Sequence, residues 1–89
     1  MKAVISVTGR DTIGIISSVS EICSRRLANI IDISQTVLQE YFSMIMMVDI
    51  EKLNVPFPEF ADELGKLGKE KGLEIHTMHE NIFSSMHRI

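Results

Sequence analysis

Several features that would assign a function class are scarce or missing in this chain of 89 residues. It has no tryptophan and a single cysteine, Cys23, which excludes an internal disulfide. No apolar run reaches the roughly 18 residues that a membrane-spanning helix needs. The first residues, MKAVISVTGRD, lack the long apolar core of a signal peptide. A lone cysteine fits a reducing compartment, so we expect a cytoplasmic protein that has no membrane partner.

Positive charge is also scarce. The formal net charge is −3, and the only basic cluster is the pair Arg25-Arg26. Proteins that hold nucleic acid or anionic lipid by charge carry larger basic patches, so we expect no nucleic-acid partner.

Groups that would support catalysis or metal binding are few. No Ser/His/Asp or Cys/His arrangement stands out, and Cys23 lies on an apolar stripe that favours a buried core position. His76 and His79 are three apart on an expected strand and would point to opposite faces, which is poor for one metal ion. We therefore expect no enzyme activity, no metal site and no cofactor.

The length and composition fit one small domain. Apolar residues make up 45 % of the chain, which is ordinary for a globular protein. A chain this short buries only about 60 % of its unfolded surface, so a partner subunit would help to stabilise it. We expect residues 1–89 to form one domain, with a short C-terminal tail or helix at about 80–89.

Changes in the period of the apolar pattern divide the chain into elements. The predicted strands are residues 2–8, two strands within 29–51 that turn near Gln39-Glu40, and 73–79. The predicted helices are residues 14–27, with the stripe Ile15, Ile16, Val19, Ile22, Cys23 and Leu27, and a second helix before Gly72, with the stripe Phe57, Phe60, Ala61, Leu64 and Leu67.

The order βαββαβ predicts an α+β fold. Right-handed crossovers give a ferredoxin-like sandwich, an antiparallel sheet of order 4-1-3-2 with helices on one face. The segment Met44–Val48 is apolar at every position, as in a strand that is covered on both faces. We expect a second copy of the chain to cover the open face or an edge of the sheet, which makes a homodimer.

The stretch TGRDTIGII, residues 8–16, places two glycines and a carboxylate where a strand passes to a helix. It lacks the Lys-Ser/Thr of a P-loop, which excludes that motif. The start of a helix offers unpaired N–H groups to a carboxylate, and Asp11 could pair with an ammonium group. Structural roles are the alternative: Asp11 as a helix cap, Gly14 for close helix–strand packing, and Asn29 in a left-handed conformation at the helix end.

The segment VTGRDTIGIISSVSEICSRRLANIIDISQ resembles the first half of an ACT domain. The matching features are Asp11-x-x-Gly14 at the start of the helix and LANI before the next strand. The whole chain is similar to stand-alone single-ACT proteins of unassigned function, in which DISQTVL, EYF and a tail like IFSSMHRI recur. It is also similar to the ACT modules of the glycine cleavage system transcriptional repressor.

The resemblance implies a βαββαβ regulatory module that binds an amino acid between two subunits. In ACT domains that bind amino acids, the positions of Asp11 and Asn29 contact the ligand, and the position of Gly14 lets the backbone approach it. The implied ligand-binding residues are Asp11, Thr12, Ile13, Gly14, Ile15 and Asn29. This chain departs from well-known binders in having Asp rather than Asn at 11, and in having Gly9 where some carry a histidine.

Two hypotheses for the function follow. The first is a regulatory module that binds an amino acid or a related small metabolite at a homodimer interface. The second is a protein-interaction adaptor that binds a protein partner through a sheet edge or face without any ligand.

Overall fold

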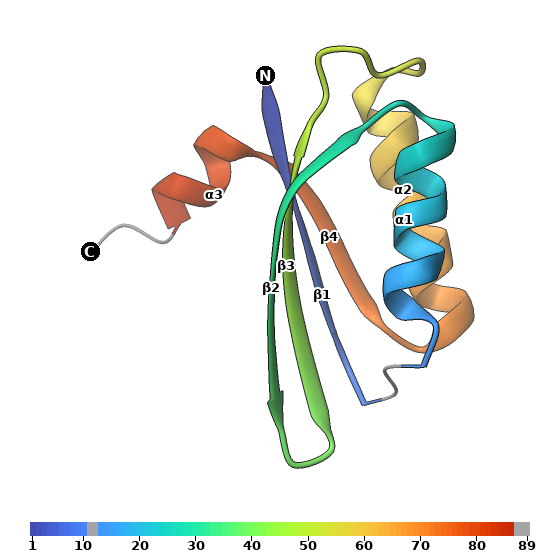
Figure 1. The fold of residues 1–89 in the computed structure, drawn as a ribbon, viewed down its shortest axis with the longest axis vertical. Coiled ribbons are helices and arrows are strands. Elements are labelled where there is room, and N and C mark those ends of the chain that lie inside the picture. Colours follow the sequence, from blue (N-terminus) through green and yellow to red (C-terminus); the bar gives the residue numbers. More distant parts are fainter. Residues whose placement is uncertain (11–12, 87–89) are drawn as a thin grey trace.

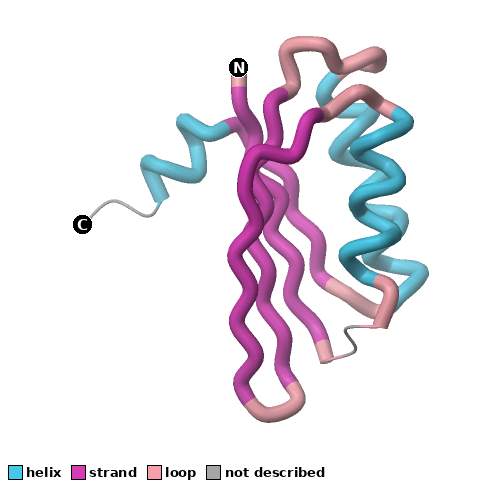
Figure 2. Tube along the Cα trace, in the orientation of Figure 1, coloured by secondary structure: helices cyan, strands magenta, loops and turns pink. Residues whose placement is uncertain are grey.

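The computed structural model of the protein describes residues 1–10 and 13–86, which form four strands and three helices (Figures 1 and 2). In chain order they are β1 (Lys2–Gly9), α1 (Ile15–Arg25), β2 (Asn29–Leu38), β3 (Tyr41–Asp49), α2 (Phe57–Lys71), β4 (Glu74–His79) and α3 (Glu80–Met86). The predicted order βαββαβ is confirmed, and α3 is a helix within the C-terminal segment.

The four strands form one antiparallel sheet in the order β2-β3-β1-β4, which confirms the predicted 4-1-3-2 arrangement. The two central strands, β1 and β3, pair from Lys2 with Asp49 to Gly9 with Phe42. The turn between β2 and β3 consists of Gln39 and Glu40, as predicted, and Gln39 takes a positive φ of 56°. This register places the end of β1, which leads to α1, beside the start of β3, which follows the turn.

Helices α1 and α2 lie side by side on one face of the sheet, whereas α3 lies on the other face (Figure 1). Side chains alternate along each strand, so every second residue points toward α1 and α2. The core between these layers is built from aliphatic, methionine and phenylalanine side chains, among them Ile5, Val7, Ile15, Val19, Phe42, Met44, Met46, Phe60 and Leu64. None of the described helices is both long and apolar enough to cross a membrane.

Strand β3 is not covered on both faces by its own chain. Phe42, Met44, Met46 and Val48 are buried under the helices, but residues on the other face, Ile45 among them, are only half-buried. The expectation of two covered faces is therefore not met within one chain. Helix α3 contacts β1 and β4, so much of this face stays open, as predicted for a monomer.

The apolar stripe of α1 is shorter than the sequence predicts. Ile15, Val19, Ile22 and Cys23 are buried, but Ile16 and Leu27 are 37 % and 56 % exposed. Leu27 lies outside the core because the helix ends at Arg25, two residues before it. The helix therefore begins and ends inside the predicted bounds of 14–27.

Candidate functional site

Gly14 occupies the N-cap position of α1, and its φ of 74° lies in the left-handed region. The Ser18 N–H donates to the Gly14 carbonyl at 2.9 Å, which is the first hydrogen bond of the helix. A Cβ built on Gly14 would meet nothing within 4 Å, so the close-packing explanation of this glycine is wrong. Glycine is favoured here because it adopts a positive φ without steric cost. The cap predicted at Asp11, and its neighbour Thr12, lie outside the described residues.

The turn before α1 offers polar and apolar contacts together. Ile13 is 86 % exposed, whereas Ile15 is buried. A hollow of about 140 Å³ beside the turn is lined by Ile13, Ile15, Lys71 and Leu73. The first turn of any α-helix presents backbone N–H groups and a partial positive charge. This end of α1 can therefore attract an anionic group and place an apolar group next to it.

Asn29 is the first residue of β2, where it is exposed and pairs with Asp49 across the sheet. The left-handed residue that ends α1 is Leu27, with a φ of 61°, so the assignment of that conformation to Asn29 is wrong. The N–H groups of Leu27 and Ala28 donate to the carbonyls of Ser24 and Cys23, at 3.3 and 2.9 Å, which is a Schellman motif. The side chain of Asn29 is not needed for this helix end and can serve another contact.

A hollow of about 510 Å³ opens beside Asn29 at this end of α1. The Asp49 carboxylate is oriented there by the Glu51 N–H, which donates to Oδ1 at 2.9 Å. The C-terminal end of a helix carries a partial negative charge, which adds to the charge of the two carboxylates. The hollow is lined by Cys23, Ser24, Leu27, Ala28, Asn29, Asp49, Glu51 and Lys52. Its chemistry suits an ammonium group, which donates hydrogen bonds and carries positive charge.

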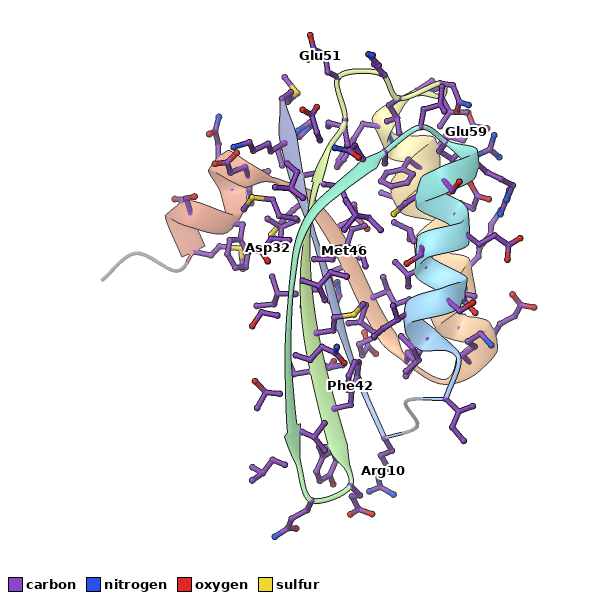
Figure 3. All side chains as sticks on the ribbon, viewed as in Figure 1. Arg10, Asp32, Phe42, Met46, Glu51 and Glu59 are labelled. Atoms are coloured by element: carbon purple, nitrogen blue, oxygen red, sulfur yellow. The ribbon has the colours of Figure 1, made fainter. Side chains whose placement is uncertain are left out.

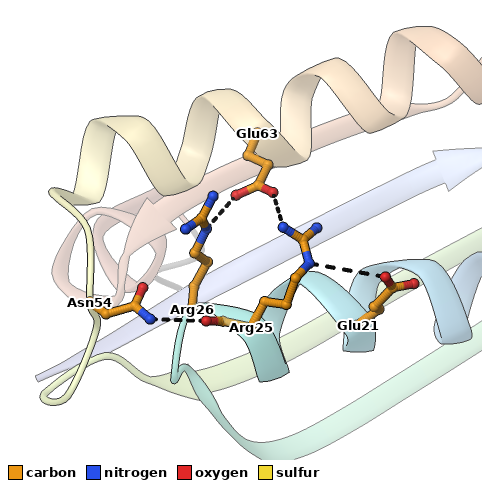
Figure 4. Close-up of polar contacts among 5 residues, drawn as sticks. All are labelled: Glu21, Arg25, Arg26, Asn54 and Glu63. Atoms are coloured by element: carbon orange, nitrogen blue, oxygen red, sulfur yellow. Dashed lines mark hydrogen bonds and ion pairs between the residues drawn. The ribbon is translucent and has the colours of Figure 1, made fainter.

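Beside this hollow, the loop between β3 and α2 is hydrogen-bonded to the C-terminal end of α1, and this end of α1 is ion-paired with α2 (Figure 4). Asn54 donates from its backbone N–H to the Arg26 carbonyl at 3.0 Å and from Nδ2 to the Arg25 carbonyl at 2.9 Å. Glu63 of α2 accepts from Arg26 Nε at 2.8 Å and pairs with Arg25 at 3.0 Å. The Arg26 hydrogen bond is the main reason that the pKa of the Glu63 carboxyl is lowered.

This network was missed by sequence reasoning. The sequence shows Arg25 and Arg26 only as a short basic pair, and no motif marks Glu63 as their partner. Arg25 and Arg26 are adjacent, but Glu63 follows them by 38 and 37 positions, so only the packing of α1 on α2 shows that they meet. No local pattern signals such a pairing, because it depends on how two helices lie on one sheet.

Among the described residues of the predicted ligand set, those at the start of α1 do not meet Asn29 within one chain. Gly14 precedes α1 and Asn29 follows it, so the two lie toward opposite ends of this helix (Figure 1). An α-helix rises 1.5 Å per residue, so the 11 residues of α1 span about 16 Å. A small ligand is shorter than this separation, so it can contact both residues only if they come from two copies of the chain.

The histidines and the cysteine of the described chain do not gather into a metal site. His76 lies opposite Ser6 and His79 opposite Ala3, so the two rings stand on opposite faces of the sheet, as predicted. Residues 1–10 and 13–86 contain no cluster of three or more His, Cys, Asp or Glu side chains suited to a metal ion. Cys23 is buried as predicted, and burial raises the pKa of its thiol to about 11.

Known proteins are similar to this chain in sequence and in fold. The ACT domain family profile matches residues 2–78. A UPF0237 protein of Methanococcus maripaludis is 48 % identical over 97 % of this chain and 96 % of its own length, and one of Clostridium acetobutylicum is 47 % identical over the full length of both. An ACT domain protein from Streptococcus pneumoniae superposes with a TM-score of 0.80, 37 % identity and 93 % coverage of each chain.

A more distant structure, described as a glycine cleavage system transcriptional repressor, shares the fold alone. Its TM-score is 0.70 at 23 % identity, over 88 % of this chain and 43 % of that one. The strand order, the position of the helices and the match over residues 2–78 all agree. The chain belongs to the ACT domain family.

Proposed function

We propose that the chain is a regulatory module that binds an amino acid at the junction of two copies. The separation of Gly14 and Asn29 by the length of α1 carries this proposal. The two ends of α1 differ in polarity, and a two-fold dimer with antiparallel α1 helices would bring unlike ends together. Each of the two equivalent junctions would then hold one ligand.

The chemistry of each end fits one half of an amino acid. The first N–H groups of α1, near Gly14, suit a carboxylate, and the hollow between Ile13 and Ile15 suits an aliphatic side chain. Asn29 and the Asp49 carboxylate suit the ammonium group. Asp11 and Thr12 complete the set that the ACT resemblance implies. The proposal needs no cofactor and no catalytic step.

The surface beside α1 offers an interface for the second copy. Strand β2 lies at the edge of the sheet, and exposed apolar side chains along it and its hairpin include Ile31, Val37, Leu38 and Tyr41. An edge strand presents unpaired N–H and C=O groups, which a second β2 could pair in an antiparallel ladder. Ligand at the junction would favour one relative placement of the copies, and this shift would be the regulatory signal. We place this role in the cytoplasm.

The test is a thermal-shift screen of the purified protein against the twenty amino acids. A ligand at a hundredfold excess over its Kd adds about 2.7 kcal/mol of stability, which is readily detected as a rise in Tm. The rise should be lost in Asp11→Ala and Asn29→Ala and retained in the matched control Asn81→Ala, which changes an exposed asparagine on α3. A flat panel, or a rise that survives Asn29→Ala, would contradict the proposal.

The exposed apolar side chains of the β2–β3 hairpin favour a second candidate function. Val37, Leu38 and Tyr41 are 64 %, 71 % and 51 % exposed, and they could dock a protein partner without any ligand. This adaptor should co-purify with its partner from the native cell at a yield that amino acids do not change. The substitution Leu38→Ser should then release the partner, whereas Asn29→Ala should not.

A further inference from the structure

Another hollow lies beside the last turn of α2, at the end of the sheet that carries the β2–β3 hairpin. Its volume is about 790 Å³, which is in the range of small-molecule sites. It is bounded by the end of β1, the start of β3, the last turn of α2 and the start of β4. We call it the Arg10 hollow. Its lining residues are Thr8, Gly9, Arg10, Tyr41, Gly68, Lys69, Lys71, Gly72, Leu73 and Glu74.

The charge in the Arg10 hollow is positive although the whole chain is negative. Its lining in the described residues contains Arg10, Lys69 and Lys71 and one carboxylate, Glu74, which lies 3.4 Å from His76 Nε2. In the part of the chain that the structure describes, none of the three cations has an ion pair, whereas Arg25 and Arg26 both pair with Glu63. Three cations and one carboxylate leave an excess of two positive charges.

Arg10 lies against the aromatic ring opposite it. Its Nη2 donates to the Tyr41 hydroxyl at 3.3 Å, and its guanidinium carbon lies 5.4 Å from the centre of the Tyr41 ring. Figure 3 shows Arg10 at the end of β1, near the end of the sheet that carries the β2–β3 hairpin. A guanidinium has five N–H donors, so Tyr41 leaves most of them available to a ligand.

The dipole of α2 explains only part of this arrangement. Lys69 and Lys71 lie in the last turn of α2, where cations offset the partial negative charge of the helix end. Arg10 comes from the opposite wall and contributes nothing to that helix end. A third cation that contacts an aromatic ring and lines the same hollow favours a ligand that is negatively charged.

We propose that the Arg10 hollow binds a small phosphate-bearing anion. A phosphate monoester carries about two negative charges near pH 7, which matches the excess of two positive charges in the hollow. The planar guanidinium of Arg10 would engage two phosphate oxygens, and Lys69 and Lys71 would act as point charges. Every residue of this site comes from one chain, so it does not depend on a dimer, although it shares Lys71 and Leu73 with the hollow assigned to the side chain of the amino acid.

The experiment is an NMR titration of the ¹⁵N-labelled protein at pH 7 with inorganic phosphate and, separately, glycerol 3-phosphate, at constant ionic strength. Saturable amide shifts should appear at Gly9, Arg10 and Gly72. Arg10→Gln and the double variant Lys69→Gln/Lys71→Gln should each raise Kd at least tenfold. The double control Lys52→Gln/Lys66→Gln removes the same charge elsewhere and should change Kd less than twofold. A lower Kd for glycerol 3-phosphate identifies an ester ligand, and equal values identify free phosphate.

Two results would overturn the proposal. No saturable shift with either anion overturns the site, and so does an equal loss in the Lys52/Lys66 control, which would show a general charge effect. Arg10→Lys keeps the charge but loses the planar fork, so it should still raise Kd about threefold. Asn29→Ala should leave phosphate binding unchanged, which separates this result from the fate of the amino-acid site.

Discussion

Two glycines on helix α2 show how strongly the effect of one methyl group depends on its surroundings. A Cβ on Gly68 would lie 2.8 Å from the Leu73 carbonyl oxygen and 3.1 Å from Ile75 Cγ1. A Cβ on Gly65, three residues earlier in the same helix, would meet nothing within 4 Å. The first glycine therefore lets α2 lie close to β4, and the second has no such role.

We predict opposite effects for alanine at these two positions. Gly68→Ala should lower the free energy of unfolding by about 1–3 kcal/mol, because the backbone carbonyl of Leu73 cannot move aside cheaply. Gly65→Ala should raise it by about 0.5–1 kcal/mol, since alanine costs less entropy in a helix. Urea denaturation of both variants checks the pair, and equal effects would show that α2 does not pack as described.

The lowered pKa of Glu63 predicts a pH dependence of stability. A carboxyl with a lowered folded pKa stabilises the protein above its unfolded pKa, near 4.5, and this contribution is lost as the pH falls through the folded value. The gap in unfolding free energy between wild type and Glu63→Gln should be full at pH 6 and should shrink as the pH falls below about 4.5 and through the folded pKa. Denaturation curves between pH 3 and 7 measure it.

A matched background isolates the cause of this gap. The hydrogen bond from Arg26 is the largest reason for the shift, and Arg25 adds a second contact. In the Arg25→Gln/Arg26→Gln background, Glu63→Gln should therefore have little effect at any pH in this range. A gap that persists in that background would assign it to some other contact of Glu63.

At the scale of elements, the sequence predicts which segments are helices and strands, but it predicts only some of the residues at which they end. The strand order, the Gln39-Glu40 turn and the end of α2 before Gly72 are as predicted, because apolar periodicity and turn residues are local signals. The end of α1 is different, since a leucine takes the left-handed position where glycine or asparagine is usual. The pairing of Glu63 with two arginines, and the separation of Gly14 from Asn29, depend on tertiary packing and on the length of α1.

We predict that Leu27→Gly stabilises the end of α1. A left-handed conformation costs a residue with a Cβ about 1–2 kcal/mol, and glycine avoids this cost. The Leu27 side chain is 56 % exposed and contributes little packing, so the net gain should be about 0.5–1 kcal/mol after the extra entropy of unfolded glycine. Thermal unfolding measures it. A loss of stability would mean that Leu27 is held by contacts that its exposure does not reveal.

At the scale of the whole molecule, one face and two edges of the sheet are open in a single chain, and the exposed edge at β2 is the proposed dimer contact. Val37→Lys should shift the protein from dimer to monomer in sedimentation velocity, because two copies would bring the new charges together along an apolar edge. Ile82→Lys is the matched control on α3, where the native side chain is 52 % exposed, against 64 % for Val37. If both variants dissociate, or neither does, the interface lies elsewhere.

Mixed dimers test whether each ligand site is shared between two copies. In the proposed arrangement Asp11→Ala spoils one half of every site and Asn29→Ala spoils the other, so neither variant alone should bind the amino acid found in the thermal-shift screen. A heterodimer of the two has one site with both halves intact and one with both halves spoiled. Random exchange makes half of the dimers mixed, so about a quarter of all sites should be restored, as measured by the stoichiometry in calorimetry. If both residues served a ligand within one chain, every site would still carry a defect, and mixing would restore nothing.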